Sequence, residues 1–332
     1  MNEDFWRGRS VLLTGAQGFI GSWLADALLG AETELTCIVR DEPVRSRFEI
    51  EGLGEYCTLA RCDLGDVRAL ERIVNEREIE AVFHLAAQAI VGTANRSPLS
   101  TFETNVRGTY NLLEACRLTS TVQRVVVASS DKAYGRHEQL PYREDAALVP
   151  RYPYDTSKAA ADLIARSYAA TYGLPVAVTR FANVYGGGDF NFSRIVPDTV
   201  RSLLEGRRPV LRSDGSPRRD FMYVEDAIGA YLAIAHALDR DDVRGLALNA
   251  GAGEAVPIIE VVERLIEIAG QRVEPEIQGS GAPAGEIDRQ YLDSTLIAEL
   301  IGWQPAWSLD DGLRETYAWY EGKLRSLPAS IT

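Results

Sequence analysis

The chain has 332 residues, of which 46% are hydrophobic and 25% charged, enough for one large domain or two modest domains with a buried core. Its 35 basic and 48 acidic residues give a net charge of −13, which argues against nonspecific binding to nucleic acids or anionic membranes. No apolar run approaches the roughly 20 residues of a membrane span, and no basic and apolar leader follows Met1. We therefore expect a cytoplasmic protein. Its 4 cysteines lack CxxC spacing and it has only 3 histidines, so we expect free thiols and no metal site.

The first half of the chain alternates between strand-like and helix-like segments. Strands are predicted over residues 10–14, 34–39, 57–61, 81–85, 124–128 and 176–181. Helices are predicted over residues 18–29, 67–75, 101–118 and 154–172. Repeated βαβ units indicate an α/β fold with a Rossmann-type, doubly wound parallel sheet, which binds its ligand at the carboxyl ends of the strands.

After residue 185 the pattern changes to shorter pieces. Helices are predicted over residues 194–204, 224–236, 258–269, 294–301 and 309–324, and strands over 209–211 and 245–249. The loop 278–285 is rich in glycine and also contains proline, and we expect it to be mobile. This half therefore predicts a smaller and less regular α/β part.

The first predicted strand runs into a glycine-rich loop with GxxGxxG spacing, formed by Gly15, Gly18 and Gly21. Gly15 permits a tight turn, Gly18 lets the backbone approach a pyrophosphate, and Gly21 lets the helix and the strand pack closely. The amino terminus of the following helix favours anionic phosphates. The spacing indicates a dinucleotide site, although a glycine-rich turn without a ligand would have the same residues.

Tyr154 and Lys158 lie one helical turn apart and therefore on one face of the predicted helix. The positive charge of Lys158 is expected to lower the pKa of Tyr154, which would make the phenol a usable general base. Ser130 ends an apolar strand upstream and is placed to share a hydroxyl proton with the tyrosine. Such a pair is also typical of an ordinary half-exposed helix, but here it follows the glycine-rich loop.

Together and in this order, the two motifs resemble the short-chain dehydrogenase/reductase superfamily. The chain resembles its extended branch, the nucleotide-sugar epimerases and 4,6-dehydratases, over nearly its whole length. Further matches are residues 84–87 (HLAA), 103–106 (ETNV), 180–186 (RFANVYG) and 219–226 (RDFMYVED).

The resemblance implies a discontinuous second domain, because the chain crosses between domains more than once in the extended branch. The expected Rossmann domain covers residues 1–182, with 221–250 returning to it, and the nucleotide-sugar-binding domain covers 183–220 and 251–330. It also implies a homodimer, in which the predicted helices at 101–118 and 154–172 form the interface.

The resemblance implies an NAD or NADP cofactor in the first domain. Arg40 stands at the end of the second strand, where NAD-preferring relatives usually have aspartate, and its guanidinium suits the 2′-phosphate of NADP. Asp41, one residue later, would instead suit the ribose of NAD, so both cofactors remain open and Arg40 favours NADP. The residues expected to bind the cofactor are Gly15, Gln17, Gly18, Phe19, Ile20, Gly21, Arg40, Asp63, Leu64, Leu85, Ala86, Ala87, Tyr154 and Lys158.

Asp131 and Lys132 follow Ser130 and resemble the acid and base of 4,6-dehydratases. In those enzymes Ser, Tyr and Lys assist oxidation at C4, the base removes the C5 proton, and the acid protonates the C6 hydroxyl as it leaves. An aspartic acid in this role needs a pKa raised by burial, and a lysine base must be neutral. Lys132 departs from the glutamate common in dTDP-glucose and GDP-mannose dehydratases. With Asp131 it resembles the Asp-Lys pair of CDP-glucose 4,6-dehydratases and of a group of UDP-sugar dehydratases.

The residues expected to line the substrate site are Gln88, Asn105, Tyr134, Asn183, Arg194 and Arg219. Arginine suits a nucleoside diphosphate because its planar fork binds phosphate oxygens bidentately, and Arg218 is an alternative to Arg219. The sequence therefore predicts a nucleotide-sugar 4,6-dehydratase, with a C4 epimerase as the alternative. A non-catalytic dinucleotide sensor is disfavoured because both Tyr154 and Lys158 are present.

Overall fold

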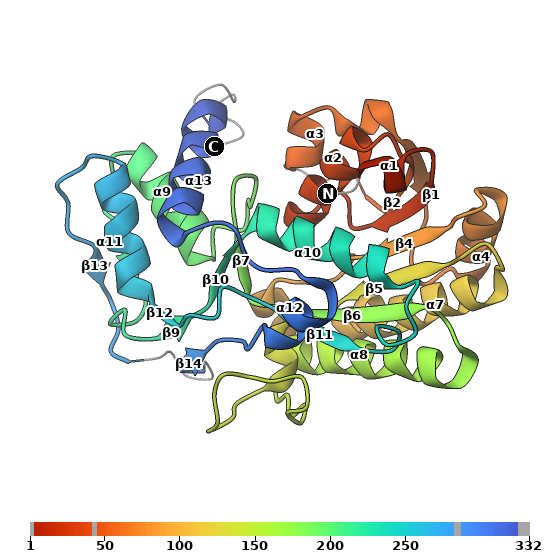
Figure 1. Ribbon diagram of the computed structural model, residues 1–332. Coiled ribbons are helices and arrows are strands. Elements are labelled where there is room, and N and C mark those ends of the chain that lie inside the picture. The colour runs from red at the N-terminus through yellow and green to blue at the C-terminus, as the bar shows by residue number, and fades with distance from the viewer. Residues whose placement is uncertain (1–2, 42–44, 282–286, 325–332) are drawn as a thin grey trace.

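The computed structural model describes residues 3–41, 45–281 and 287–324. Half of the loop predicted to be mobile, residues 282–285, lies outside the described residues. Figure 1 shows a large lobe, in which helices cover both faces of one sheet, beside a smaller lobe that contains α9, α11 and α13. Across the described residues, none of the helices combines the length and apolar character that crossing a membrane requires.

The large sheet has seven strands in the order β11-β6-β5-β4-β1-β2-β3, and all neighbours pair in parallel. The strands are β1 (Ser10–Thr14), β2 (Glu34–Val39), β3 (Thr58–Arg61), β4 (Ala81–His84), β5 (Arg124–Ala128), β6 (Val176–Phe181) and β11 (Ala247–Ala250). The strand order reverses between β1 and β4, the switch point at which such sheets open a crevice for a ligand. The predicted doubly wound parallel sheet is confirmed.

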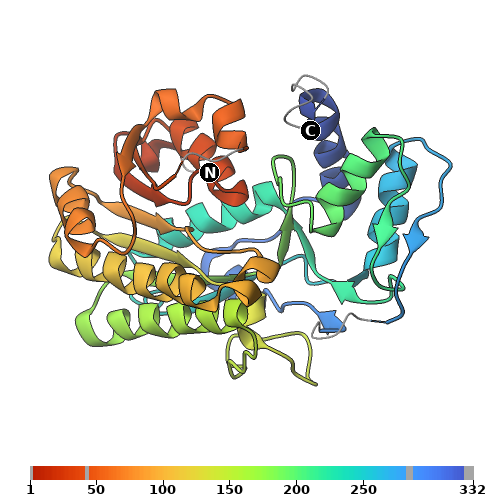
Figure 2. The same ribbon diagram turned by 180° about the vertical axis from the view of Figure 1, so that it is seen from behind.

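The central strands are apolar runs because both faces of the sheet are covered. Every residue of β4, β5 and β6 is buried. One face packs against α1 (Glu3–Trp6), α2 (Phe19–Gly30) and α10 (Val224–Ala237). The other face packs against α4 (Val67–Glu76), α7 (Gly108–Leu118) and α8 (Pro153–Tyr172), as Figure 2 shows from behind.

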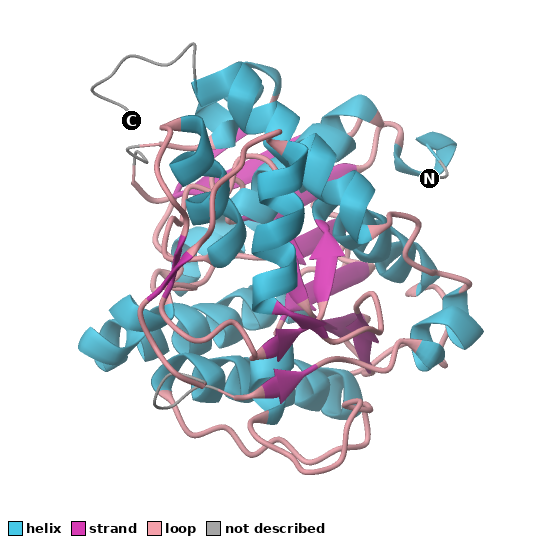
Figure 3. Ribbon diagram, turned by 90° about the vertical axis from the view of Figure 1, so that its left-hand side faces the viewer, coloured by secondary structure: helices cyan, strands magenta, loops and turns pink. Residues whose placement is uncertain are grey.

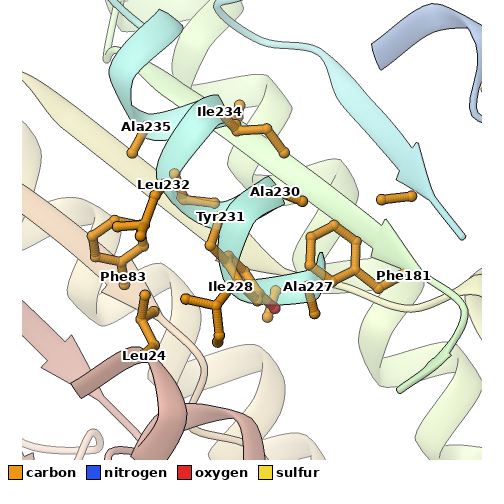
Figure 4. Packing of buried hydrophobic residues seen from close by; sticks show 14 of the residues in the cluster. Leu24, Phe83, Phe181, Ala227, Ile228, Ala230, Tyr231, Leu232, Ile234 and Ala235 are labelled. Atoms are coloured by element: carbon orange, nitrogen blue, oxygen red, sulfur yellow. The ribbon is translucent and has the colours of Figure 1, made fainter. Parts of the chain in front are cut away.

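Helix α10 contributes many of the apolar core residues on the face of the sheet that it covers. Tyr231 packs edge-on against Phe83 of β4 and is tilted against Phe181 of β6. Figure 4 shows these rings together with Leu24 of α2 and the small residues of α10, which let the helix lie close to the sheet. These contacts explain why the chain returns to the large lobe from Val224 on.

Short helical pieces connect the main elements, and one of them refines a prediction. They are α3 (Arg47–Ile50), η1 (Leu53–Tyr56), α5 (Val91–Arg96), α6 (Pro98–Phe102), η2 (Glu103–Arg107) and η3 (Asp131–Tyr134). The segment predicted as a helix over 101–118 is helical throughout but not uniformly α-helical, because a π-helical turn, η2, lies between α6 and α7. This wider turn turns Asn105 inward, where its side chain bonds to two other segments.

The smaller lobe has a core of its own, formed by α9 (Ile195–Leu204), α11 (Ile258–Ile268) and α13 (Leu309–Leu324), and Figure 3 views the molecule from this side. Helix α12 (Thr295–Ile301) packs instead against β11 and α10. The predicted helices of this half are confirmed to within one residue or two.

Its strands are only two or three residues long, and most were not predicted because so short a run has no readable alternation. They are β7 (Asn183–Tyr185), β8 (Val210–Leu211), β9 (Arg218–Arg219), β10 (Phe221–Tyr223), β12 (Val256–Pro257), β13 (Glu276–Ile277) and β14 (Arg289–Gln290). They form the sheets β10-β7, β12-β9-β14 and β13-β8. The domain boundaries expected from the sequence stay a prediction.

Candidate active site

A cleft of about 1580 Å³ is lined by the carboxyl ends of β1, β2, β4 and β5 and by residues of the smaller lobe. Every residue predicted to bind the cofactor lines it, and so do Ser130, Asp131 and Lys132. Of the predicted substrate residues, Asn183, Arg194 and Arg219 line it. The fold thus brings residues from both halves of the sequence into one cavity.

Gln88, Asn105 and Tyr134 are corrections, because none of them is among the residues that line the cleft. Tyr134 is fully buried, donates a hydrogen bond to Asn249 Oδ1 at 2.7 Å, and stacks on Tyr142. Its side chain therefore packs in the protein interior and stabilises the turn η3 instead of facing a ligand.

Asn105 supports the site without lining it. Its Oδ1 accepts a hydrogen bond from the Gln88 backbone N at 2.7 Å, and its Nδ2 donates to Ser157 Oγ at 2.8 Å. The side chain is 2% exposed, so these bonds are protected from water. Asn105 thereby ties the loop after β4 to the helix that carries Lys158.

The glycine-rich loop can hold a pyrophosphate only because of its close backbone packing. Gly15 has a φ of +80°, and a Cβ there would lie 2.7 Å from the Ala86 backbone N. A Cβ at Gly21 would lie 1.9 Å from the Gly15 carbonyl oxygen. Helix α2 begins after Gly18 with no side-chain cap, so its first N–H groups remain available to an anion. This arrangement fits a dinucleotide.

A buried histidine, whose role the sequence analysis missed, orients the loop after β4. His84 Nδ1 lies 2.8 Å from Thr14 Oγ1, and Nε2 lies 3.0 Å from Thr109 Oγ1. Burial lowers the pKa of His84 to about 3, so the imidazole stays neutral. Thr14 Oγ1 also accepts a hydrogen bond from the Ala86 backbone N, which fixes the cofactor-side loop. A histidine at the end of an apolar strand was the available signal.

Tyr154 and Lys158 lie in α8, as predicted, but their electrostatics differ from the expectation. Burial raises the pKa of Tyr154 to about 12, and the charge of Arg194 and a hydrogen bond with Ser130 oppose this rise. Lys158 Nζ donates to the Ala128 carbonyl at 2.7 Å, and burial lowers its pKa to about 8. The expectation that Lys158 lowers the pKa of Tyr154 is therefore wrong for the protein alone, because burial dominates and Arg194 is the principal opposing cation.

Asp131 is held as a buried carboxyl with one free oxygen. It is 2% exposed, and burial raises its pKa even though Lys132, Ser130 and Arg219 oppose the shift. Its Oδ1 accepts a hydrogen bond from Ser130 Oγ at 3.0 Å, while its buried Oδ2 has no hydrogen-bond partner among the described residues. The predicted direction of the pKa is confirmed, and a protonated Oδ2 can donate to a ligand.

Three arginines lie on the substrate side of the cleft. Arg194, which precedes α9, pairs with Asp189 at 2.9 Å. Arg219 of β9 is 5% exposed and lines the cleft, whereas its neighbour Arg218 does not. Arg212, which follows β8 and was not predicted, also lines the cleft. Arg219 is therefore the better of the two alternatives.

At the opposite end of the cleft, Arg40 and Asp41 follow β2 side by side. Arg40 Nε donates to Asp41 Oδ2 at 2.5 Å, and both side chains are more than half exposed. Both side chains that were weighed as cofactor determinants thus line the same end of the cleft. Among the described residues, no group of three or more His, Cys, Asp or Glu side chains is arranged to hold a metal ion.

Comparison with known proteins finds relatives over the whole chain. The model of the NAD dependent epimerase/dehydratase family matches residues 11–251. A CDP-glucose 4,6-dehydratase of Salmonella typhimurium is 30% identical, over 98% of this chain and 94% of that protein. The structure of a dTDP-glucose 4,6-dehydratase from Bacillus anthracis in complex with NAD is similar at a TM-score of 0.85 with 27% identity, covering 98% of this chain and 100% of that one. A UDP-glucose 4-epimerase from Thermotoga maritima, solved with UDP-glucose, has a TM-score of 0.86 and 29% identity, covering 95% of this chain and 99% of that one.

Proposed function

Because this chain belongs to the NAD-dependent epimerase/dehydratase family, we propose that it is a nucleotide-sugar 4,6-dehydratase that forms an NDP-4-keto-6-deoxyhexose. The observation that carries the proposal is Asp131, a buried carboxyl with an unpartnered oxygen that lines the cleft beside Lys132. Loss of water needs a group that can hold and then give up a proton, and burial, which raises the pKa of Asp131, favours its protonated form.

The residues of the cleft divide the proton transfers among them. Tyr154 takes the proton of the C4 hydroxyl in its phenolate form, which Arg194 and the hydrogen bond with Ser130 favour against burial and which the positive charge of a bound oxidised nicotinamide would favour further. The C4 ketone acidifies the C5 proton, which Lys132 removes. Asp131 gives its proton to the C6 hydroxyl, which leaves as water. A bound nicotinamide would supply the hydride chemistry between C4 and C6, and Lys132 would return the proton to C5 as C6 is reduced.

The cofactor is held by the backbone of the Gly15–Gly21 turn and by Lys158. The family is NAD-dependent, and we propose that this chain also accepts NADP, because the Arg40 guanidinium suits a 2′-phosphate. Asp41 offsets this preference, since its carboxylate pairs with Arg40 and would repel the phosphate. Comparing the affinities for the two cofactors by fluorescence titration tests the point.

The substrate in this proposal is an NDP-glucose or NDP-mannose of the CDP, dTDP or GDP type. Asn183, Arg194 and Arg219 line the side of the cleft where the diphosphate would lie. We infer that residues 183–220 and 251–330 form the domain that binds it. The Asp131-Lys132 pair favours a CDP-sugar, by analogy with CDP-glucose dehydratases.

The proposal includes a cytoplasmic homodimer. Helices α7 and α8 expose large apolar side chains, with Tyr110 41%, Leu163 55% and Tyr172 58% exposed, on the two helices that pair in dimers of this family. Sedimentation of the purified protein at twice the mass of 36.5 kDa would support the dimer.

A C4 epimerase is the second candidate, and the fold match to the epimerase from Thermotoga maritima favours it. Epimerisation needs no acid for a C6 hydroxyl and would leave the burial of Asp131 without a role. The test is mass spectrometry of the products from CDP-glucose, dTDP-glucose, UDP-glucose, UDP-N-acetylglucosamine and GDP-mannose. Loss of one water from one substrate supports the dehydratase, whereas a new sugar of unchanged mass would favour the epimerase.

A further inference from the structure

The loop between β7 and α9, residues 186–194, ends at Arg194 and carries a buried aspartate. Asp189 is 3% exposed, and its Oδ2 lies 2.9 Å from Arg194 Nη1. Its Oδ1 accepts a hydrogen bond from the Asn191 backbone N at 3.0 Å. The Asp189 carbonyl in turn accepts a hydrogen bond of 2.6 Å from the hydroxyl of Tyr320, which is fully buried in α13. A short chain of bonds therefore connects α13 to Arg194.

The same loop is fixed at its other end by both lobes. Trp23 of α2 donates from Nε1 to the Gly187 carbonyl at 2.8 Å. A Cβ at Gly187 would lie 2.3 Å from Trp319 of α13, so the indole ring lies directly on the backbone. Gly188 has a φ of +85°, and a Cβ there would lie 2.8 Å from Arg47 Cβ. The loop is thus packed between the first helices of the chain and the last one.

Arg194 is the member of this chain of contacts that reaches the reacting centre. Its side chain is 41% exposed and lines the cleft, and its charge acts on Tyr154. Arginine has five N–H donors, so the bond to Asp189 leaves others available to phosphate oxygens. None of the described residues of α13 lines the cleft. That helix reaches the site through residues that contact it: the loop is one route, and Tyr185, which lines the cleft and donates to the Leu309 carbonyl at 3.2 Å, is another.

We propose that Asp189 and Tyr320 are positioning residues, which hold the Arg194 guanidinium where it meets the diphosphate of the substrate. Asp189 sets the direction of the guanidinium through the ion pair, and Tyr320 fixes Asp189 through its backbone. The identity of the bound group rests on the proposed function, because a nucleoside diphosphate is the ligand that Arg194 would contact in a nucleotide-sugar enzyme. The C-terminal helix controls the site in this way without touching the substrate.

The test is a double-mutant cycle read by binding, with the NAD-loaded protein titrated calorimetrically with CDP, UDP, dTDP and GDP. Arg194→Ala is expected to weaken the best of these ligands about tenfold or more, the loss of one charge-assisted contact. Asp189→Asn, which keeps the shape and the acceptor for Asn191, is expected to weaken it nearly as much. The double variant should bind no worse than Arg194→Ala, because the two residues act as one unit.

A second variant and a matched control separate positioning from stability. Tyr320→Phe keeps the ring packing and removes the hydroxyl, and it should weaken binding about three- to fivefold with little change in melting temperature. Asp198→Asn removes a similar ion pair, to Arg201 in α9 at 2.7 Å, outside the cleft lining, and should leave the affinity unchanged.

The proposal is overturned if Asp189→Asn leaves the affinity unchanged, or if its effect multiplies fully with that of Arg194→Ala. It also fails if the wild-type protein binds none of the four nucleoside diphosphates. Binding and turnover are separate readouts. Coupling between Asp189 and Arg194 without loss of water from any sugar would reject the dehydratase and keep the positioning role, and the reverse result would reject only the positioning role.

Discussion

The two halves of the cleft are built in different ways. The cofactor half comes from consecutive strand–turn–helix units and depends on close backbone contacts, such as those of Gly15 and Gly21. The substrate half takes Asn183, Arg194 and Arg219 from separate segments and depends on buried charges. A backbone cradle suits a ligand that every family member shares, whereas side chains on loops can vary with the substrate.

The buried titratable groups of the two halves show the same contrast in their pKa values. On the cofactor side, His84 is kept neutral and the ligand meets backbone N–H groups. On the substrate side, burial raises the pKa of Asp131, which lines the cleft. Burial also raises the pKa of Asp155 to about 6 and that of Asp220 to about 7, but neither of these two carboxyls lines the cleft. Of the three, Asp131 is the one placed for proton transfer.

The largest effect is expected from replacing the proposed acid of the substrate half. Asp131→Asn keeps the size of the side chain but cannot supply a proton, so elimination of water should fall by about 10²–10⁴-fold. Removal of the C4 hydroxyl proton depends on Tyr154, so oxidation at C4 should continue. Stopped-flow absorbance of the reduced nicotinamide, combined with product mass spectrometry, separates the two steps. Full water loss by this variant would remove Asp131 from the mechanism.

The base assignment is tested separately at Lys132. Lys132→Ala should also abolish elimination, because no other group is assigned to the C5 proton. Exchange of the C5 hydrogen with deuterated water, followed by mass spectrometry, measures this step directly. If exchange and elimination persist at the wild-type rate, Lys132 is not the base.

The next largest effect is expected from replacing a closely packed glycine in the cofactor half. Gly21→Ala places a methyl group against the Gly15 carbonyl oxygen, so the turn must shift, at a cost of about 1–3 kcal/mol in stability, and affinity for NAD should be largely lost. Gly30→Ala on the same helix is the control, because a Cβ there meets nothing within 4 Å. Thermal melting and NAD titration of both variants check this, and equal behaviour of the two would contradict the backbone-cradle account.

Asp155 offers a test by pH. Its pKa is raised by burial from 3.8 to about 6, so the folded state prefers the protonated form, and stability present below pH 3.8 is lost as the pH rises through 6. Asp155→Asn does not titrate. Its stability relative to the wild type should therefore rise by roughly 1–1.5 kcal/mol between pH 5 and pH 7.5. Urea unfolding at the two pH values measures the difference in stability between the two proteins. A difference that does not change with pH would show that the pKa of Asp155 is not raised in the folded state.

The smallest expected effect concerns Arg40. Arg40→Ala should weaken NADP about tenfold and leave NAD nearly unchanged, because only NADP carries the phosphate that a guanidinium binds. Isothermal titration with both cofactors measures the ratio. An equal loss of affinity for both cofactors would show that Arg40 does not recognise the 2′-phosphate and only pairs with Asp41 at the surface.

Sequence reasoning succeeded where the information is local. Apart from β3, which is partly exposed, the strands of the first half are largely buried apolar runs, and the glycine spacing fixes the turn after β1, so both were readable. It failed where tertiary packing decides. The π-helical turn at Asn105 and the inward orientation of Tyr134 depend on partners such as Ser157 and Asn249, which are distant in the sequence.

The electrostatic error has the same origin. The i, i+4 spacing correctly placed Lys158 beside Tyr154, but spacing carries no information on burial, which dominates the pKa of both side chains. Arg194, 40 residues further along the chain, supplies the opposing charge that Lys158 was expected to provide. The preference for Arg219 over Arg218, by contrast, came from the match over residues 219–226, and Arg219 lines the cleft whereas Arg218 does not.

The central claim is that one cleft oxidises C4, removes water across C5 and C6, and returns the same hydride to C6. The most direct test uses the accepted nucleotide sugar labelled with deuterium at C4. The account predicts a product that has lost one water and carries the deuterium in its C6 methyl group, as seen by mass spectrometry and proton NMR. Deuterium retained at C4 in a product of unchanged mass would contradict the account and establish an epimerase.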